Sequence, residues 1–528
     1  MMEDTATASP SDSVMWYSII LCFPPVLLLL FHRLFSRNKL NLLPPPGPKP
    51  WPLIGNLNLI GQLPHVSLHS LSQKYGPIIQ LKFGLETVVV ASSAEVAELI
   101  LKTHDLTFAS RPALLAGKHA NFNYLVMATA PYGPHWRQTR KTFKTQILSP
   151  KRLVQSEYIR VEERKALLFK MYKSSSSSSP SSTPVHLKDR LYMFNLATMS
   201  RMLLGKRYTE DNQNNIVTAK EFTEIVDEVF FISGILDIGD AIPWLAFLDL
   251  QGNVKRMKAV KKKADKFYEH VLDEHERHAK RKSFNEHGTK DMVDVLLQLA
   301  DDPTLEVKVE RDHIKAAIQD LLLGGIETSA ITTEWAMSEL LKNPRVIQKA
   351  TEEIDRVIGR NKWVEEKDIV NLPYIQAIVK EVMRLHPPVT LLVPRLAREN
   401  CKVAGYDIIK NSRVIVNVWA IGRDPTLWEK PNEFCPERFI GKEIDVVGHN
   451  FELLPFGAGR RMCVGYALGL ITVQSTLANL LHGFEWKLPG NVRKEDLDME
   501  ERFGVTTSRK NPLLVVPKPR LPLDLYSS

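Results

Sequence analysis

The chain contains few cysteines. Four occur among its 528 residues: Cys22, Cys401, Cys435 and Cys463. A disulfide scaffold, a structural zinc site and an iron–sulfur cluster each need several thiolates or imidazoles, and these spacings match none of them. We therefore expect reduced thiols in a domain that faces the cytosol, with Cys401 and Cys435 as small buried hydrophobic residues.

Charged residues are absent from residues 13–31, which include the run WYSIILCFPPVLLLLF. At about 1.5 Å per residue this run nearly spans the roughly 30 Å hydrocarbon layer of a bilayer. Acidic residues precede the run and basic residues follow it, so we predict a lumenal segment over 1–12, a membrane anchor helix over 13–35 and a cytosolic chain beyond it. The acidic leader and the lack of a small-residue cleavage site disfavour a signal peptide. The Pro24-Pro25 pair leaves a kinked or partly inserted anchor open.

Six prolines between Pro44 and Pro52 exclude a continuous helix there. We predict a basic and proline-rich hinge over 36–55, which serves either as a linker or as a rigid spacer. Length alone favours about three domains beyond it, but no second break in composition occurs, so residues 56–528 are predicted to form one catalytic domain. The serine-rich stretch 173–184 is predicted to be a solvated surface loop.

Hydrophobic periodicity predicts a mainly α fold with a small β portion. A strand pair is expected within 80–91, around Gly84. Helices are expected over 94–102, 134–145, 187–204, 220–231, 254–281, 310–341, 344–358 and 374–385.

The helix expected from residue 310 contains the stretch LLLGGIETSAITTEW. Gly324 and Gly325 each cost the helix about 1 kcal/mol relative to alanine, but a missing side chain lets another group approach the backbone. Glu327 and Thr328 place an acid beside an alcohol, and at a widened helical turn such a pair can organise water and deliver protons. The alternative is close helix packing through glycine, with Thr328 bonded back to a backbone carbonyl.

The stretch KEVMRLHPP places Glu381 and Arg384 on one face of a helix, and FCPERF supplies Arg438 in a turn further along the chain. Each feature alone is weak evidence, because most Glu-x-x-Arg pairs are solvated helix surface worth less than about 0.5 kcal/mol.

The order of these features is informative. The glycine-pair helix, Glu-x-x-Arg and Pro-Glu-Arg-Phe are followed by PFGAGRRMCVGYALG, in which Phe456, Gly459, Arg461, Cys463 and Gly465 match Phe-x-x-Gly-x-Arg-x-Cys-x-Gly. In this order the motifs resemble those of the cytochrome P450 haem-thiolate monooxygenases. The wording of GGIETSAITTEW and LPFGAGRRMC is similar to the plant microsomal A-type branch, in particular to enzymes of specialised metabolism.

The resemblance implies the cytochrome P450 fold, anchored in the endoplasmic reticulum membrane by a single pass, with haem b (iron protoporphyrin IX) as cofactor. A porphyrin supplies four nitrogens to its iron, so one axial sulfur, that of Cys463, is enough. The resemblance assigns the haem propionates to Arg461, Trp136 and Arg140, and also to Arg395. The alternatives are that Trp136 is ordinary core and Arg395 a surface charge. Gly324 and Gly325 are expected to line the haem from the opposite side.

The resemblance also assigns roles in catalysis. Thr328 is expected to hydrogen-bond oxygen or water, Glu327 to connect the site to bulk protons, and Glu381, Arg384 and Arg438 to form a structural network beneath the haem. O2 is the implied co-substrate. The chain lacks a complete Gly-x-Gly-x-x-Gly motif, so the electrons of NADPH are expected to arrive through a separate cytochrome P450 reductase, with cytochrome b5 as a further candidate partner.

The formal net charge is +9, and no recognised nucleic-acid-binding module accompanies it, so we expect no nucleic acid among the partners. An acidic electron-transfer protein is expected to dock on a basic cluster. This cluster comprises Arg137, Arg140, Lys141, Lys144, Lys151 and Arg152. Solvated helix charge and attraction to anionic lipid are the alternatives.

By position in the family, the substrate pocket is expected to be lined by 113–126, 222–231, 390–393 and 505–507. These largely apolar segments indicate a lipophilic ligand, either a terpenoid or a phenylpropanoid such as a flavonoid, that is hydroxylated or oxidatively cleaved. Two alternatives remain open: a haem-thiolate isomerase or dehydratase that needs no reductase, and a non-catalytic haem-binding protein.

Overall fold

The computed structural model describes residues 42–175, 184–208, 217–235, 237–282, 291–490 and 492–526. The predicted lumenal segment and anchor lie outside the described residues, as do residues 36–41 of the hinge and most of the serine-rich stretch. Among the helices of the described residues, none is both long enough and apolar enough to cross a membrane.

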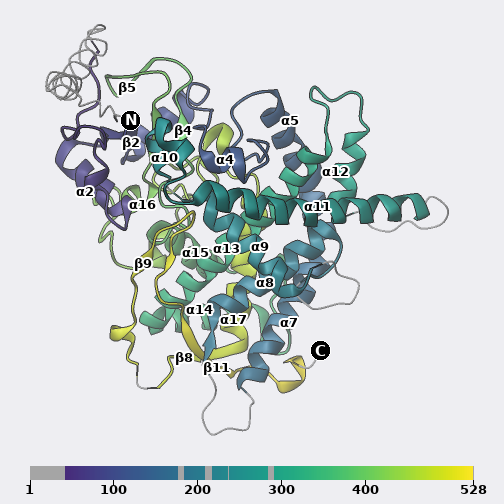
Figure 1. The fold of residues 1–528 in the computed structure, drawn as a ribbon. Coiled ribbons are helices and arrows are strands. Elements are labelled where there is room, and N and C mark those ends of the chain that lie inside the picture. The colour runs from purple at the N-terminus through teal and green to yellow at the C-terminus, as the bar shows by residue number, and fades with distance from the viewer. Residues whose placement is uncertain are drawn as a thin grey trace, which may run out of the picture.

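Helices form most of the body, which confirms the predicted mainly α class (Figure 1). They are α2 (Pro64–Tyr75), α3 (Ala94–Glu98), α4 (Leu115–His119), α5 (Pro134–Thr142), α6 (Pro150–Gln155), α7 (Glu157–Ser175), α8 (Leu187–Leu204), α9 (Ala219–Ser233), α10 (Ile238–Ala241), α11 (Asn253–Lys282), α12 (Met292–Ala300), α13 (Arg311–Lys342), α14 (Pro344–Ile358), α15 (Pro373–Leu385), α16 (Val418–Ile421) and α17 (Tyr466–Gly483).

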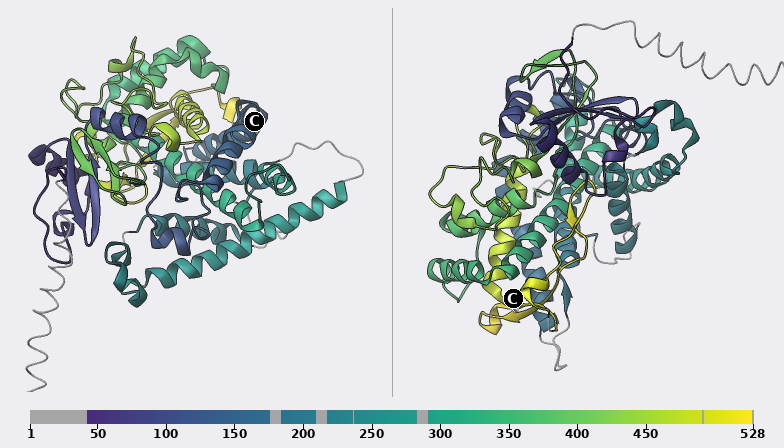
Figure 2. Two further views of the ribbon diagram at one scale, coloured as in Figure 1. Left: turned by 90° about the horizontal axis from the view of Figure 1, so that it is seen from above. Right: turned by 90° about the vertical axis from the view of Figure 1, so that its left-hand side faces the viewer.

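All eight expected helices are present, and α8 and α14 have the predicted bounds. The helices α3 and α5 each continue into a short π-helical segment, over Leu99–Thr103 and Phe143–Ile147. Figure 2 shows α11 as a long straight helix along one side of the body. Among the longer helices, α2, α7, α12 and α17 were not predicted.

The β portion consists of small sheets. Their strands are β1 (Ile78–Phe83), β2 (Glu86–Ala91), β3 (Val185–His186), β4 (Arg395–Leu396), β5 (Cys401–Val403), β6 (Tyr406–Ile408), β7 (Arg413–Val416), β8 (Phe484–Lys487), β9 (Glu501–Arg502), β10 (Ser508–Arg509) and β11 (Leu514–Pro519). The largest sheet has the order β1-β2-β7-β4, in which β2 and β7 are parallel and the other pairs antiparallel. The β1–β2 hairpin, with Gln80 opposite Val89, confirms the predicted strand pair.

The described part of the hinge is attached to this sheet. The amide of Gln80 donates to the carbonyl of Pro46 at 2.9 Å, and the amide of Lys82 donates to the side-chain oxygen of Asn56 at 2.8 Å. Residues 42–50 form no helix or strand, as the prolines predicted. The proline-rich segment therefore lies along β1, at the edge of the sheet, and is held there by hydrogen bonds.

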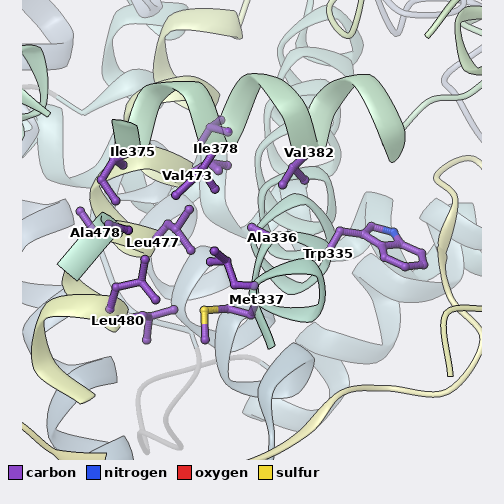
Figure 3. Close-up of a cluster of buried hydrophobic side chains, with 14 of the residues drawn as sticks. Trp335, Ala336, Met337, Ile375, Ile378, Val382, Val473, Leu477, Ala478 and Leu480 are labelled. Atoms are coloured by element: carbon purple, nitrogen blue, oxygen red, sulfur yellow. The ribbon is translucent and has the colours of Figure 1, made fainter. Parts of the chain in front are cut away.

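The main hydrophobic core lies where α13, α15 and α17 meet (Figure 3). Met337 of α13, Ile378 of α15 and Leu477 of α17 are fully or almost fully buried there. Because α13 also packs against α8, it is enclosed on several sides. This packing fixes the start of α17, and with it the loop that precedes Tyr466, relative to the middle of α13.

Candidate functional site

The loop before α17 has a tightly determined backbone. Gly459 has φ of +67°, and a Cβ at this position would lie 2.2 Å from the carbonyl oxygen of Leu101. No other residue fits here without moving the backbone. The amide of Cys463 donates to the carbonyl of Phe456 at 2.9 Å, which closes the loop.

The thiol of Cys463 is surrounded by protein, yet the residue keeps accessible surface. Its accessible surface therefore faces the interior of the protein. Burial raises the pKa of the Cys463 thiol, while a hydrogen bond from the amide of Gly465 and the charge of Arg140 lower it. These two groups stabilise a thiolate relative to a thiol.

The two glycines of α13 face different surroundings. A Cβ on Gly324 would meet no atom within 4 Å, whereas a Cβ on Gly325 would lie 2.6 Å from the sulfur of Met199 on α8. Gly324 therefore borders open space. The side of Gly325 on which a Cβ would stand faces α8, so this glycine permits close packing of α13 against α8. The expected widened turn is not found, since α13 is regular from Arg311 to Lys342.

The hydroxyl of Thr328 donates to the carbonyl of Gly324 at 2.8 Å. This is the back-bonded arrangement considered as the alternative, and it leaves the hydroxyl oxygen free to accept a hydrogen bond. Gly324 and Thr328 lie four residues apart and so share one face of the helix.

The neighbouring acid, Glu327, forms an ion pair with Lys188 of α8 at 3.5 Å. Burial raises the pKa of Glu327, Lys188 opposes this change, and Asp227 of α9 adds to it. Tyr192 donates to Asp227 at 2.5 Å. The acid therefore belongs to a polar group that reaches α8 and α9. The sequence did not indicate Lys188, because no local pattern links it to Glu327.

Arg461 points inward. Its Nε donates to the carbonyl of Ala109 at 2.6 Å and its Nη2 to that of Ala130 at 2.7 Å, while its guanidinium lies 4.3 Å from the ring centre of Trp136. Arg140 lies 5.6 Å from the same ring and donates to the carbonyl of Met462 at 2.8 Å. Trp136 thus contacts two guanidinium groups beside the cysteine loop and is not ordinary core.

Arg395 is also buried, so its interpretation as a surface charge is wrong. It is 4% exposed, forms an ion pair with Asp105 at 3.2 Å and donates to the carbonyl of Ala458 at 2.9 Å. A fourth arginine, Arg111, was not predicted. It is buried and donates to the carbonyls of Val393 and Pro394.

Positive charge exceeds negative charge in this cluster. The four arginines face two carboxylates, those of Asp105 and Asp320. Burial, together with repulsion by Arg395 and Arg140, lowers the pKa of Arg461 to about 9. Such a surplus fits a bound group with two carboxylates, as the propionates of haem b provide. The donor set therefore fits the cofactor that the resemblance implies.

Asp320 was also missed by the sequence interpretation. It lies four residues before Gly324 on α13, and its carboxylate accepts the amides of Met127 and Ala128. Burial raises its pKa to about 7 even though these two amides and Arg461 act in the opposite direction. Asp320 thus ties the loop that follows α4 to α13.

The predicted structural network is assembled. Nε and Nη2 of Arg384 each donate to the carboxylate of Glu381 at 2.7 Å, and Nε of Arg438 donates to it at 3.0 Å. The amide of Cys435 donates to the same carboxylate at 2.8 Å, so this cysteine is only half-buried and lies at the network rather than in a core. The Glu381 and Arg384 side chains are both 0% exposed. A buried charge group this well saturated holds the turns after α16 against α15.

The two ends of the expected pocket segment 222–231 differ in exposure. Phe222 is completely buried among Tyr208 and Phe267. A residue that lines an open pocket keeps accessible surface, so the expectation for Phe222 is wrong. Phe231 is 54% exposed and lies beneath the guanidinium of Arg256 at 4.9 Å.

The predicted basic cluster lies on α5, the π-helical segment that follows it, and α6. Lys141, Lys144 and Lys151 are exposed. Arg137 is paired with Glu306 at 3.0 Å. Arg140 does not belong to this surface, because it points toward Met462 next to the cysteine.

Comparison with known proteins adds three findings. The family model described as Cytochrome P450 matches residues 45–516. The chain is 44% identical to the trimethyltridecatetraene synthase of Zea mays, over 93% of this chain and 91% of that protein, and 42% identical to the flavonoid 3'-monooxygenase of Petunia hybrida, over 97% and 99%. A zebrafish cytochrome P450 structure with abiraterone shares the fold, with a TM-score of 0.71 at 24% identity over 87% of this chain and 100% of that chain.

Proposed function

Because the chain belongs to the cytochrome P450 family, we propose that it is a membrane-anchored monooxygenase that hydroxylates or oxidatively cleaves a lipophilic plant metabolite. Enzymes of this family use haem, O2 and electrons from NADPH delivered by a reductase. The observation that most strongly supports this function is the single thiol of Cys463. It faces the protein interior beside a surplus of buried arginines, and its loop precedes a helix packed against α13.

We assign Cys463 as the axial thiolate ligand of the haem iron and Arg461, Arg140, Trp136 and Arg395 as the surroundings of its propionates. Bound haem supplies O2 activation and transfer of one oxygen atom to a substrate C–H bond. The amide of Gly465 and the charge of Arg140 hold the sulfur as an anion.

The α13 face that contains Gly324 and Thr328 is assigned to oxygen and protons. Gly324 has no side chain and so leaves room beside the helix. The oxygen of Thr328 is placed to accept a hydrogen bond while its proton is held by the carbonyl of Gly324. Glu327, whose pKa is raised by burial, is assigned to pass protons inward. The ion pair with Lys188 favours the carboxylate form of Glu327.

The substrate class is proposed as a terpenoid or a flavonoid-type phenylpropanoid. The trimethyltridecatetraene synthase, named for an unsaturated hydrocarbon, and the flavonoid 3'-monooxygenase are similar to this chain to about the same degree, at 44% and 42% identity. Leu125, in the first expected pocket segment, and Leu391 and Leu392, in the third, are apolar and keep accessible surface. This supports a lipophilic ligand without separating the two classes.

We further propose that the chain is divided into a lumenal segment, a membrane anchor, a hinge and a cytosolic domain, and that the anchor lies in the endoplasmic reticulum membrane.

An exposed apolar patch supports a bilayer contact by the domain itself. The amide of Gly84 donates to the carbonyl of Ile54 at 3.1 Å, and the amide of Leu85 donates to that of Ala241 at 3.1 Å, so the hinge, the β1–β2 turn and α10 adjoin. Their exposed apolar side chains are Trp51, Leu53, Leu85, Trp244, Phe247 and Leu250.

The reductase, and cytochrome b5 as a second candidate, are proposed to dock on Lys141, Lys144 and Lys151. These residues lie on or shortly after α5, whose Arg140 reaches the carbonyl of Met462 beside Cys463. Electrons that enter on this face have a short path to the sulfur side of the haem.

The function is tested in two steps. Full-length protein is expressed with a reductase, reduced with dithionite and exposed to carbon monoxide, and we expect the red-shifted Soret band of thiolate ligation. A panel of terpenoids and flavonoids is then supplied, with products identified by mass spectrometry. Products that form without NADPH would favour the isomerase or dehydratase alternative, and a normal spectrum with no product from any ligand would favour a non-catalytic haem protein.

A further inference from the structure

Two histidines and two glutamates that the proposed mechanism does not use lie together inside the molecule. Nε2 of His386, just after α15, lies 2.7 Å from the carboxylate of Glu339 on α13. Nε2 of His65 on α2 lies 2.7 Å from the carboxylate of Glu501 on β9. Nδ1 of His386 has no hydrogen-bond partner and lies 3.9 Å from Glu501. His386 thus stands between the two carboxylates.

The cluster holds one end of the turn between β9 and β10, whereas Thr507 holds the other. The amide of Thr507 donates to the carbonyl of Pro388 at 2.8 Å, and its carbonyl accepts the indole N–H of Trp335 at 3.2 Å. The hydroxyls of Thr507 and Thr390 lie 3.1 Å apart. The chain on both sides of residues 502–506 is therefore attached to residues that directly follow His386 or contact it.

This turn borders the proposed substrate space. Val505 contacts the backbone of Gly234 at the end of α9 so closely that a Cβ on Gly234 would lie 2.3 Å from it. Leu392, two residues beyond Thr390, reaches the cysteine loop, where a Cβ on Gly457 would lie 3.6 Å from its side chain. A shift of the turn would therefore disturb the contact of Val505 with the end of α9 and, through Thr390, the position of Leu392 beside the cysteine loop.

His386 is placed to act as a cation. Its ring stacks on the indole ring of Trp335, with ring centres 4.0 Å apart and an interplanar angle of 4°. The π electrons of the indole stabilise the imidazolium form of His386 relative to the neutral form. Figure 3 shows Trp335 at the margin of the core, directed away from the contact of α15 with α17. The charged or titratable groups around His386 are Glu339 on α13, Glu501 on β9, His65 on α2, Arg423 after α16 and Arg509 on β10.

We propose that His386, as an imidazolium between Glu339 and Glu501, is a positioning residue that fixes the 501–507 turn and thereby determines which substrate atoms reach the haem. The proposal rests on the proposed monooxygenase function. Supporting it, the hydrogen bonds and charges of Glu339 and Glu501 raise the pKa of His386, although burial, the largest single effect, lowers it. The imidazolium is fully present below a pH of about 6.5, and its bridge is lost as the pH rises through this raised value.

The test compares His386→Gln and Glu501→Gln with the matched control Glu500→Gln, in haem-containing full-length protein. Glu500 is the preceding residue, is exposed and pairs only with Lys510 among the described residues. Hydrogen–deuterium exchange is measured over 499–509. We expect both test variants to exchange about tenfold faster there than wild type and control, with unchanged exchange across α13 and a normal carbon monoxide spectrum. Unchanged exchange in both test variants would overturn the proposal.

Substrate binding and product distribution supply a second readout. We expect both test variants to bind substrate about tenfold more weakly and to oxidise more positions on it, with the control unchanged. Wild type should lose protection of the turn at alkaline pH beyond the ordinary base-catalysed rate, whereas His386→Gln should not. Exchange needs no turnover, so a failed carbon monoxide spectrum would reject the proposed function without deciding the role of His386. Faster exchange with unaltered product positions would reject control of substrate orientation.

Discussion

The hydroxyl of Thr328 bonds to the helix backbone and is also assigned a role in the proposed reaction. Its proton is donated to the carbonyl of Gly324 at 2.8 Å, so the oxygen stays free to accept a hydrogen bond. Thr333 makes the same kind of bond to Ser329 at 2.9 Å but is buried on another face of α13. The two threonines therefore share a local structure and differ in what they face.

We predict that Thr328→Ala lowers the amount of product formed per NADPH consumed and raises peroxide release, because water beside Gly324 loses its acceptor. The effect is expected to reach about tenfold or more in coupling. Product, peroxide and NADPH are quantified in parallel, with Thr333→Ala as control. Equal coupling in Thr328→Ala and wild type would remove Thr328 from the catalytic residues.

Individual residues could be predicted where their function depends on neighbours in the chain. Cys463, Arg461 and Thr328 belong to short motifs, and their shared role at one site stays a prediction. Lys188 and Asp320 could not be found in this way. Each acts by contacting a segment distant in sequence, and no periodicity or spacing encodes such a pairing.

At the scale of elements, α15 is held by charge as well as by apolar packing. Glu381 balances Arg384 and Arg438 and also accepts the amide of Cys435. Arg384 extends the network to the carbonyl of Pro431 at 2.6 Å. The segment from Pro431 to Arg438 is thus held to α15 by a network centred on one buried carboxylate.

We predict that Glu381→Gln destabilises the protein by about 3–5 kcal/mol, because it leaves two buried arginines without their counter-charge. The expected result is protein with little incorporated haem, measured by carbon monoxide difference spectroscopy and by urea unfolding. Glu352→Gln, at an exposed position on the neighbouring α14, is the control. A normal haem complement in Glu381→Gln would refute the assignment.

Helices were predicted where one face is apolar and the other polar. The helix α17 is buried continuously from Thr472 to Gly483, so it lacks the alternation that reveals an amphipathic helix. In α7 the charged residues Arg160, Glu163 and Arg164 are buried, which places polar residues where the pattern requires apolar ones. Tertiary ion pairs, such as Arg160 with Glu366 at 2.6 Å, compensate for this and cannot be seen in the local sequence.

The whole molecule presents its apolar patch on one border, formed by the hinge, the β1–β2 turn and the segment after α10. Phe247 is 82% exposed and Trp51 is 64% exposed. Solvation of such a contiguous surface is unfavourable, and a bilayer interface relieves it. The patch includes Trp51 and Leu53 of the described hinge.

We predict that Phe247 enters the interfacial region of a bilayer. A solvent-sensitive fluorophore attached at Phe247→Cys should shift its emission to the blue when the full-length protein is placed in lipid nanodiscs. The same label at Lys494→Cys, an exposed position away from the patch, should not shift, and the unsubstituted chain corrects for native cysteines. Identical emission at both positions would contradict the proposed bilayer contact.

Periodicity and the ordered motifs together predicted the mainly helical fold with a small β portion and the family to which the chain belongs. Both predictions are confirmed. The division of the chain into anchor, hinge and one domain stays a prediction. Sequence could not place the patch, since its members come from segments that meet only through backbone bonds such as Gly84 to Ile54.

The attachment of Pro46 and Asn56 to β1 has a mechanical consequence. A tether bound to the sheet at two points cannot swivel like a string, so it transmits torque between whatever holds residue 42 and the folded body. Rotation of the body about this segment would have to break these contacts with β1. The orientation of the folded body relative to whatever holds residue 42 is therefore set by a short rigid segment and not by the reach of a loose linker.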